Sequence, residues 1–144
     1  MNALASGERK CFSDSTAAEE NGKKFIIERG KFKKEQFCKI KVDSCLVLGT
    51  NSHKCDYVFV RCSNQDFYFV ELKGSNVDWA VEQIQSSIQY FKQHFTLQPK
   101  QIHAYIVSSG VPESANLKFR KKQFEFKKIG QELERSTNQY IKHL

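Results

Sequence analysis

The sequence has little proline, no long apolar run and no paired cysteine motif. Its 144 residues include only two prolines, so long irregular segments are not expected. No stretch approaches the roughly 18 apolar residues that a membrane-spanning helix needs. The N-terminus lacks the charged and apolar regions of a secretory signal peptide. We therefore expect an intracellular, cytoplasmic protein without a membrane span.

The five cysteines contain no Cys-x-x-Cys pair, and their number is odd. Four of them fall within predicted strands. This pattern is typical of reduced, largely buried thiols in a cytosolic protein. One alternative is a zinc site built from His53 and Cys55. The four histidines are scattered and define no other cluster.

Length and charge indicate a single basic domain. A chain of this length forms one domain with its own core, here residues 1–144, of which 1–13 are expected to be a flexible N-terminal segment. Its composition, 40% hydrophobic and 27% charged, is that of a globular protein. Lys and Arg number 23 against 16 Asp and Glu, a net charge of +7. A basic balance suits a polyanionic partner, because phosphate contacts release counterions.

The most informative stretch spans residues 55–74. Two runs, 58–60 and 67–72, are rich in β-branched and aromatic residues and contain no proline. The polar residues 63–66 between them supply a turn. This pattern predicts a β-hairpin. Apolar residues on both faces predict central strands that are covered on each side.

Charged residues gather at the open end of this predicted hairpin. Side chains alternate along a strand, so Glu71 and Lys73 emerge on one face. Antiparallel pairing makes Asp56 their cross-strand neighbour. One interpretation is an exposed ion pair worth about 0–1 kcal/mol. The other is a divalent-metal site, because one or two carboxylates typically hold Mg²⁺, and the backbone carbonyl of Leu72 would be a further ligand.

An Asp before one strand and Glu-Leu-Lys-Gly at the end of the next resemble the signature of the PD-(D/E)xK nuclease superfamily. The resemblance implies that Asp56 and Glu71 bind Mg²⁺ or Mn²⁺, and that Lys73 serves the hydrolytic water. Cys55 replaces the family's proline. Residues 41–45, 55–57 and 71–74 are also similar to a branch of small uncharacterised bacterial proteins, which supports the fold but supplies no substrate.

The remaining chain predicts an α/β fold with a mixed (α+β) sheet flanked by helices. Apolar residues at three- and four-residue steps predict a helix over 77–95, capped by Ser75 or Asn76. A right-handed crossover then makes strand 101–108 parallel to the strand of Glu71. The other expected elements are a short helix at 17–20 ended by Asn21-Gly22, strands at 25–27 and 37–48, a helix (or strand) at 116–128, and a strand or helix at 131–144. This order matches the αβββαβ core of the restriction-endonuclease-like superfamily over roughly residues 14–110.

Accessory acidic and polar residues are less clearly defined. An N-terminal helix in the superfamily often supplies another carboxylate, for which Glu20 is the candidate, with Glu19 and Glu28 as alternatives. Asp43 would join the metal site, although an Asp before Ser44 more often bonds local backbone. Gln83 lies at the margin of the helical stripe. It is only an accessory candidate, because the family spacing Gln-x-x-x-Tyr is absent.

Two basic segments are either solvated faces or phosphate-contacting surfaces: Lys33 and Lys34 at a predicted turn, and Lys118, Arg120, Lys121 and Lys122 in the 116–128 segment. The leading hypothesis is a metal-dependent nuclease with DNA favoured over RNA. The alternatives are a non-catalytic nucleic-acid-binding module and an accessory subunit of a nuclease or defence complex. So small a chain would need loops, a homodimer or a partner protein for specific recognition.

Overall fold

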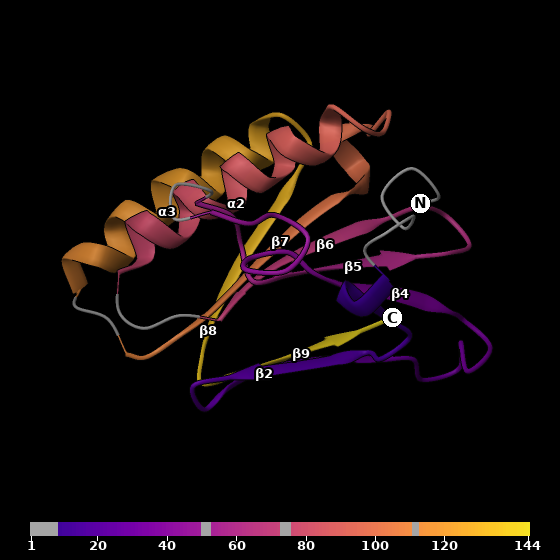
Figure 1. Ribbon diagram of the computed structural model, residues 1–144. Helices are drawn as coiled ribbons and strands as arrows, with labels where there is room; N and C mark the ends of the chain where they lie inside the picture. Colours follow the sequence, from indigo (N-terminus) through magenta and orange to yellow (C-terminus); the bar gives the residue numbers. More distant parts are fainter. Residues whose placement is uncertain (1–8, 50–52, 73–75, 111–112) are drawn as a thin grey trace.

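The computed structural model describes residues 9–49, 53–72, 76–110 and 113–144, which form two β-sheets and two α-helices (Figure 1). This confirms the predicted mixed α/β class. The six-stranded sheet has the order β1-β4-β5-β6-β7-β8, and the three-stranded sheet has the order β2-β3-β9. The elements are β1 (Phe12–Ser13), β2 (Ala17–Glu20), β3 (Lys23–Glu28), β4 (Phe37–Lys41), β5 (Tyr57–Arg61), β6 (Phe67–Leu72), α2 (Val77–Lys92), β7 (Ile102–Ser108), α3 (Glu113–Lys128), β8 (Glu132–Thr137) and β9 (Gln139–His143), with short 3-10 turns at Arg9–Cys11 and Pro99–Gln101.

The central hairpin forms as predicted. Strands β5 and β6 pair antiparallel, with Tyr57 opposite Val70 and Val60 opposite Phe67. Strand β7 lies parallel to β6, and β8 lies parallel to β7. Each parallel pair is joined by a helix, as a crossover connection requires. The sheet is therefore antiparallel on one side of β6 and parallel on the other.

Two hydrophobic cores cover the two faces of the six-stranded sheet. Alternation along the strands sends Val58 and Phe69 to the face covered by α2, and Phe59 and Val70 to the opposite face. All four side chains are buried, as expected for central strands. Figure 1 shows both helices on one face and the β2-β3-β9 sheet on the other. By the same alternation, Glu71 belongs to the helix-covered face.

The predicted N-terminal helix at 17–20 is wrong. These residues form β2, which pairs antiparallel with β3. Asn21 and Gly22 both have positive φ, 52° and 75°, which is the geometry of a tight hairpin turn that Asn-Gly favours. Ala18 is buried in the second core. Burial against the large sheet therefore outweighs the helix propensity of Ala and Glu.

The long strand predicted over 37–48 ends early, at Lys41. The chain then turns back on itself: the N–H of Val47 donates to the carbonyl of Val42 at 2.9 Å, and Ser44 has a φ of 63°. Leu48 is 73% exposed. The apolar run 45–48 therefore marks a compact turn rather than a strand.

The prediction that all cysteines are reduced is also wrong. Cys11 and Cys45 form a disulfide across 34 residues, with a Cα–Cα distance of 5.7 Å that suits such a bond. The thiols of Cys38, Cys55 and Cys62 are free, and only Cys55 is buried. The turn after β4 brings Cys45 to the N-terminal 3-10 turn, an approach that spacing along the chain does not reveal.

The helix that the apolar period predicted over 77–95 forms as α2, which ends at Lys92. Asn76 caps α2, because its side-chain oxygen accepts from the N–H of Trp79 at 3.0 Å. The segment 116–128 belongs to α3, so the strand alternative is excluded. Within 131–144 the chain forms two strands instead of a helix, and β9 adds to β3 in parallel. Neither helix of the described part combines the length and apolar content needed to cross a bilayer.

Candidate functional site

Asp56 and Glu71 lie together at the open end of the central hairpin. The backbone N–H of Asp56 donates to Oε1 of Glu71 at 3.1 Å. The N–H of Leu72 in turn donates to Oδ2 of Asp56 at 2.8 Å. Asp56 is 5% exposed and Glu71 is completely buried. Each carboxylate is therefore held by a backbone N–H of the opposite strand, and the pair forms a preorganised acidic site. Lys73, the third residue of the signature, lies outside the described residues.

An acidic pocket of about 320 Å³ adjoins Asp56. Glu20 and Asn21 enter it from the β2–β3 turn, and Asp43 enters from the turn after β4. Asp56 forms part of the wall, and Lys41 and Ser44 complete the lining. The structure thus brings two of the accessory candidates to Asp56, from segments that are distant in the sequence.

Tyr57, which sequence analysis did not single out, holds Glu20 in place. Its hydroxyl donates to Oε1 of Glu20 at 3.4 Å, and Nζ of Lys39 lies 4.8 Å from the centre of its ring. Burial, followed by the negative charge of Glu20, raises the pKa of Tyr57 to about 12. The phenol therefore stays protonated at neutral pH and remains a hydrogen-bond donor. Its position next to Asp56 was the only sequence signal.

Gln83 does not line the acidic pocket, but it hydrogen-bonds to the chain segment that precedes Asp56. Its Nε2 donates to the carbonyl of Lys54 at 3.4 Å. One turn later, the hydroxyl of Ser87 donates to the carbonyl of Gln83 at 2.9 Å and accepts from the N–H of Cys55 at 2.8 Å. These bonds fasten α2 to the residues just before Asp56. Burial raises the pKa of the Cys55 thiol, which keeps it neutral.

The chemistry of the carboxylate pair fits a hard divalent cation. Mg²⁺ prefers oxygen ligands and often needs only one or two protein carboxylates, because water and substrate phosphate complete its octahedron. Asp56, Glu71 and the carbonyl of Leu72 would be such ligands. Among the described residues, no group of three or more His, Cys, Asp and Glu side chains is arranged to hold a metal.

The predicted nucleic-acid-binding residues lie apart from the carboxylates. Lys33 and Lys34 are exposed in the loop between β3 and β4, where they line a separate hollow of about 650 Å³. The others lie on α3. There Lys118 pairs with Asp78 at 3.8 Å and Lys122 pairs with Glu125 at 3.6 Å, while Arg120 and Lys121 are exposed and make no ion pair with any described residue. No residue of either basic set lines the acidic pocket.

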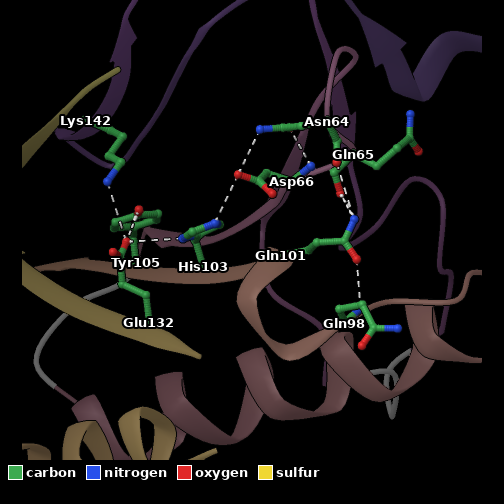
Figure 2. Close-up of polar contacts among 9 residues, drawn as sticks. All are labelled: Asn64, Gln65, Asp66, Gln98, Gln101, His103, Tyr105, Glu132 and Lys142. Atoms are coloured by element: carbon green, nitrogen blue, oxygen red, sulfur yellow. Dashed lines mark hydrogen bonds and ion pairs between the residues drawn. The ribbon is translucent and has the colours of Figure 1, made fainter. Parts of the chain in front are cut away.

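A second polar cluster connects the beginnings of β6, β7 and β8 (Figure 2). The imidazole of His103 lies between Asp66, at 3.4 Å, and Glu132, at 3.6 Å. Glu132 also accepts from the hydroxyl of Tyr105 and lies 3.7 Å from the ammonium of Lys142. Contact with His103, then the bond from Tyr105 and the charge of Lys142, lowers the pKa of Glu132 to about 2 against the effect of burial.

This cluster fastens three strands and the adjoining loop. Gln101 extends it, because its Nε2 donates to the carbonyls of Asn64 and Gln65. Sequence analysis missed the cluster, since its members meet only through the parallel register of the sheet. Comparisons of the chain with protein-family models, with curated proteins and with solved structures found no match.

Proposed function

We propose that this protein is a metal-dependent nuclease that hydrolyses phosphodiester bonds, with DNA as the preferred substrate. One observation carries the proposal. The carboxylates of Asp56, just before β5, and Glu71, in β6, are each held by a backbone N–H of the neighbouring chain segment, and Asp56 lines an acidic pocket. Carboxylate oxygens held in a fixed arrangement are the ligands that a hard divalent cation such as Mg²⁺ prefers.

In this proposal Asp56 and Glu71 hold Mg²⁺ or Mn²⁺, with the Leu72 carbonyl as a further ligand. The bound cation would polarise a phosphate oxygen and lower the pKa of a water molecule. Lys73 orients that water and offsets charge that develops on the phosphate. Glu20 and Asp43 help to position the incoming water from the pocket wall.

The strand and helix order β4-β5-β6-α2-β7 supports a restriction-endonuclease-like core, because it reproduces the βββαβ part of that arrangement. The departure is at the N-terminus, where β2 and β3 replace the helix. In this proposal Glu20, from the end of β2, takes the place of the acidic residue that such a helix would contribute.

The test is a cleavage assay with Mg²⁺ and with Mn²⁺ on single-stranded, double-stranded and branched DNA and on RNA. We expect Asp56→Asn and Lys73→Ala to lose at least about 100-fold of the cleavage rate, the scale of losing one electrostatic contact to the transition state. Glu125→Gln, which neutralises an exposed carboxylate on α3, is the control for charge. Cleavage that persists in both site variants would refute the proposal.

A non-catalytic nucleic-acid-binding module is the second candidate. It is favoured by the separation between the basic residues of α3 and the acidic pocket. This alternative predicts salt-sensitive binding to nucleic acid and no cleavage in the presence of either Mg²⁺ or Mn²⁺. Binding that is unchanged in Asp56→Asn, together with no cleavage by the wild type on any substrate, would support it.

A further inference from the structure

A groove of about 490 Å³ lies between the second half of α3 and the start of β8. Arg120, Phe124 and Lys127 line it from the helix, and Leu133 and Glu134 line it from the strand. Strands β6 and β8 run in the same direction. Glu71 lies near the end of β6, whereas the groove lies at the beginning of β8, so the groove is toward the opposite end of the sheet from Asp56 and Glu71. Its volume is in the range that accommodates a small molecule or a single nucleotide.

Phe124 is the most unusual residue of this groove. Its side chain is 63% exposed, whereas Phe119 and Phe126 of the same helix are 7% and 3% exposed and pack into the core. The fold therefore does not need an aromatic ring at position 124. Aromatic side chains commonly line ligand pockets, and the exposed ring of Phe124 inside a groove is accessible to a ligand.

The helical side of the groove is strongly basic. Arg120 and Lys127 line it, and Lys121 and Lys128 lie beside it on the same helix. None of these four cations makes an ion pair with a described residue, in contrast to Lys118 and Lys122. The ammonium of Lys128 lies 5.8 Å from the centre of the Phe124 ring. Unneutralised positive charge around an exposed aromatic ring suits a ligand that is both anionic and aromatic.

The strand side of the groove carries fixed acceptors. Nε2 of Gln123 donates to the carbonyl of Leu133 at 2.9 Å and to Oε2 of Glu134 at 3.1 Å. The carboxylate of Glu132 is engaged by His103, Tyr105 and Lys142 on the opposite face of the sheet (Figure 2), so the carboxylate that serves the groove is that of Glu134. Carboxylates repel phosphate but accept hydrogen bonds from the amino groups of nucleobases. The groove thus separates a side suited to phosphate from a side suited to a base edge.

We propose that this groove binds an unpaired nucleotide of a single-stranded nucleic acid. The base stacks on Phe124, the flanking phosphates contact Arg120 and Lys127, and an amino group on the base donates to Glu134. Stacking on exposed aromatic rings within a positively charged groove is how proteins bind single strands without reading a sequence. A duplex would bind less well, because its bases are already stacked and paired.

The proposal goes beyond the nuclease activity, because binding here requires neither a metal nor catalysis. If the nuclease proposal and the groove proposal are both correct, the cleaved substrate is single-stranded where it contacts the groove. Lys127 and Lys118 are about 14 Å apart along α3 at 1.5 Å per residue. Lys118 contacts Asp78 in the first turn of α2, the helix that follows the Glu71 strand. The basic residues of α3 therefore extend from the groove toward the acidic end of the sheet.

The test measures binding of fluorescently labelled oligonucleotides by anisotropy, in EDTA so that no cleavage occurs. Phe124→Ala should weaken single-strand binding about 10-fold, since stacking on one aromatic ring accounts for factors of this order. Phe124→Trp should restore it. Leu117→Ala removes another exposed apolar side chain of α3 outside the groove and should leave the affinity unchanged.

The phosphate and base contributions are tested separately. The double variant Arg120→Gln/Lys127→Gln should reduce the slope of log affinity against log salt by about 1.4, for two lost contacts to a single strand. An abasic oligonucleotide keeps the phosphates but lacks bases, so it should bind the wild type and Phe124→Ala equally.

Equal single-strand affinities of Phe124→Ala and the wild type would overturn the proposal. So would anionic lipid vesicles or heparin that bind as tightly as the oligonucleotide and show the same loss in Phe124→Ala. Cleavage by the wild type and by Asp56→Asn, measured beside the binding assay, separates this proposal from the nuclease proposal. If wild-type cleavage fails but Phe124-dependent binding holds, only the nuclease is refuted. If cleavage depends on Asp56 but binding does not depend on Phe124, only the groove is refuted.

Discussion

The end of the sheet where β6 stops and the end where β8 begins differ in both chemistry and exposure. At the first, Asp56 and Glu71 are buried and fixed by backbone hydrogen bonds beside an acidic pocket. At the second, an exposed phenylalanine and cations that form no ion pair with a described residue line a groove. Buried carboxylates in a rigid sheet suit chemistry that needs exact positioning of a cation. An exposed basic helix suits binding that tolerates many sequences.

The largest predicted contrast lies within α3 and concerns stability. Phe126→Ala should cost about 3–5 kcal/mol of unfolding free energy, because Phe126 is 3% exposed and its removal leaves a cavity. Phe124→Ala should change it by less than about 0.5 kcal/mol. Chemical denaturation of both variants checks this. A large loss in Phe124→Ala would mean that its ring is structural, which would undermine the comparison.

The disulfide should stabilise the acidic end in particular. Cys45→Ser should lower the free energy of unfolding by about 3–4 kcal/mol, because the bond closes a loop across 34 residues. Asp43 and Ser44, which line the acidic pocket, lie next to Cys45 and should become mobile. We expect slower cleavage but unchanged single-strand affinity at the groove. Cys62→Ser, at an exposed free thiol, is the control, and equal stability of the two variants would argue against the bridge.

Acid should act on the groove end through Glu132. Its pKa is lowered from 4.5 to about 2 in the folded state, mainly by His103. A lowered folded-state pKa stabilises the fold above pH 4.5, and the stabilisation is lost as the pH falls toward 2. After allowance for partial exposure, Glu132→Gln should cost about 1–2 kcal/mol at neutral pH. Urea denaturation between pH 7 and pH 2 should show a shallower acid dependence in the variant, and identical slopes would contradict this assignment.

The smallest predicted effect tests the link between Tyr57 and Glu20. Tyr57→Phe removes the 3.4 Å hydrogen bond and keeps the ring, so it should cost about 0.5–1.5 kcal/mol. Because Glu20 lines the acidic pocket, cleavage should slow while groove affinity stays the same. Tyr140→Phe, at a half-buried tyrosine of β9, is a matched control. Equal cleavage rates of both variants would show that Glu20 does not depend on Tyr57.

The amino-acid sequence by itself determined the elements with local patterns. Alternating and continuous apolar runs predicted the β5–β6 hairpin, and the helical period predicted α2, since side-chain periodicity depends only on neighbours along the chain. The crossover rule then predicted that β7 is parallel to β6. Hairpin geometry also predicted that Asp56 and Glu71 meet, because a short turn fixes which residues face each other.

Only the tertiary structure decided how segments far apart in the sequence pair and pack. Residues 17–20 became a strand because Ala18 is buried against the large sheet, and Cys45 met Cys11 because the chain turns after β4. The parallel register brought His103 to Glu132, and the packing of α3 left Phe124 exposed. Each outcome depends on contacts between residues far apart in the chain, whose energies local propensities do not contain.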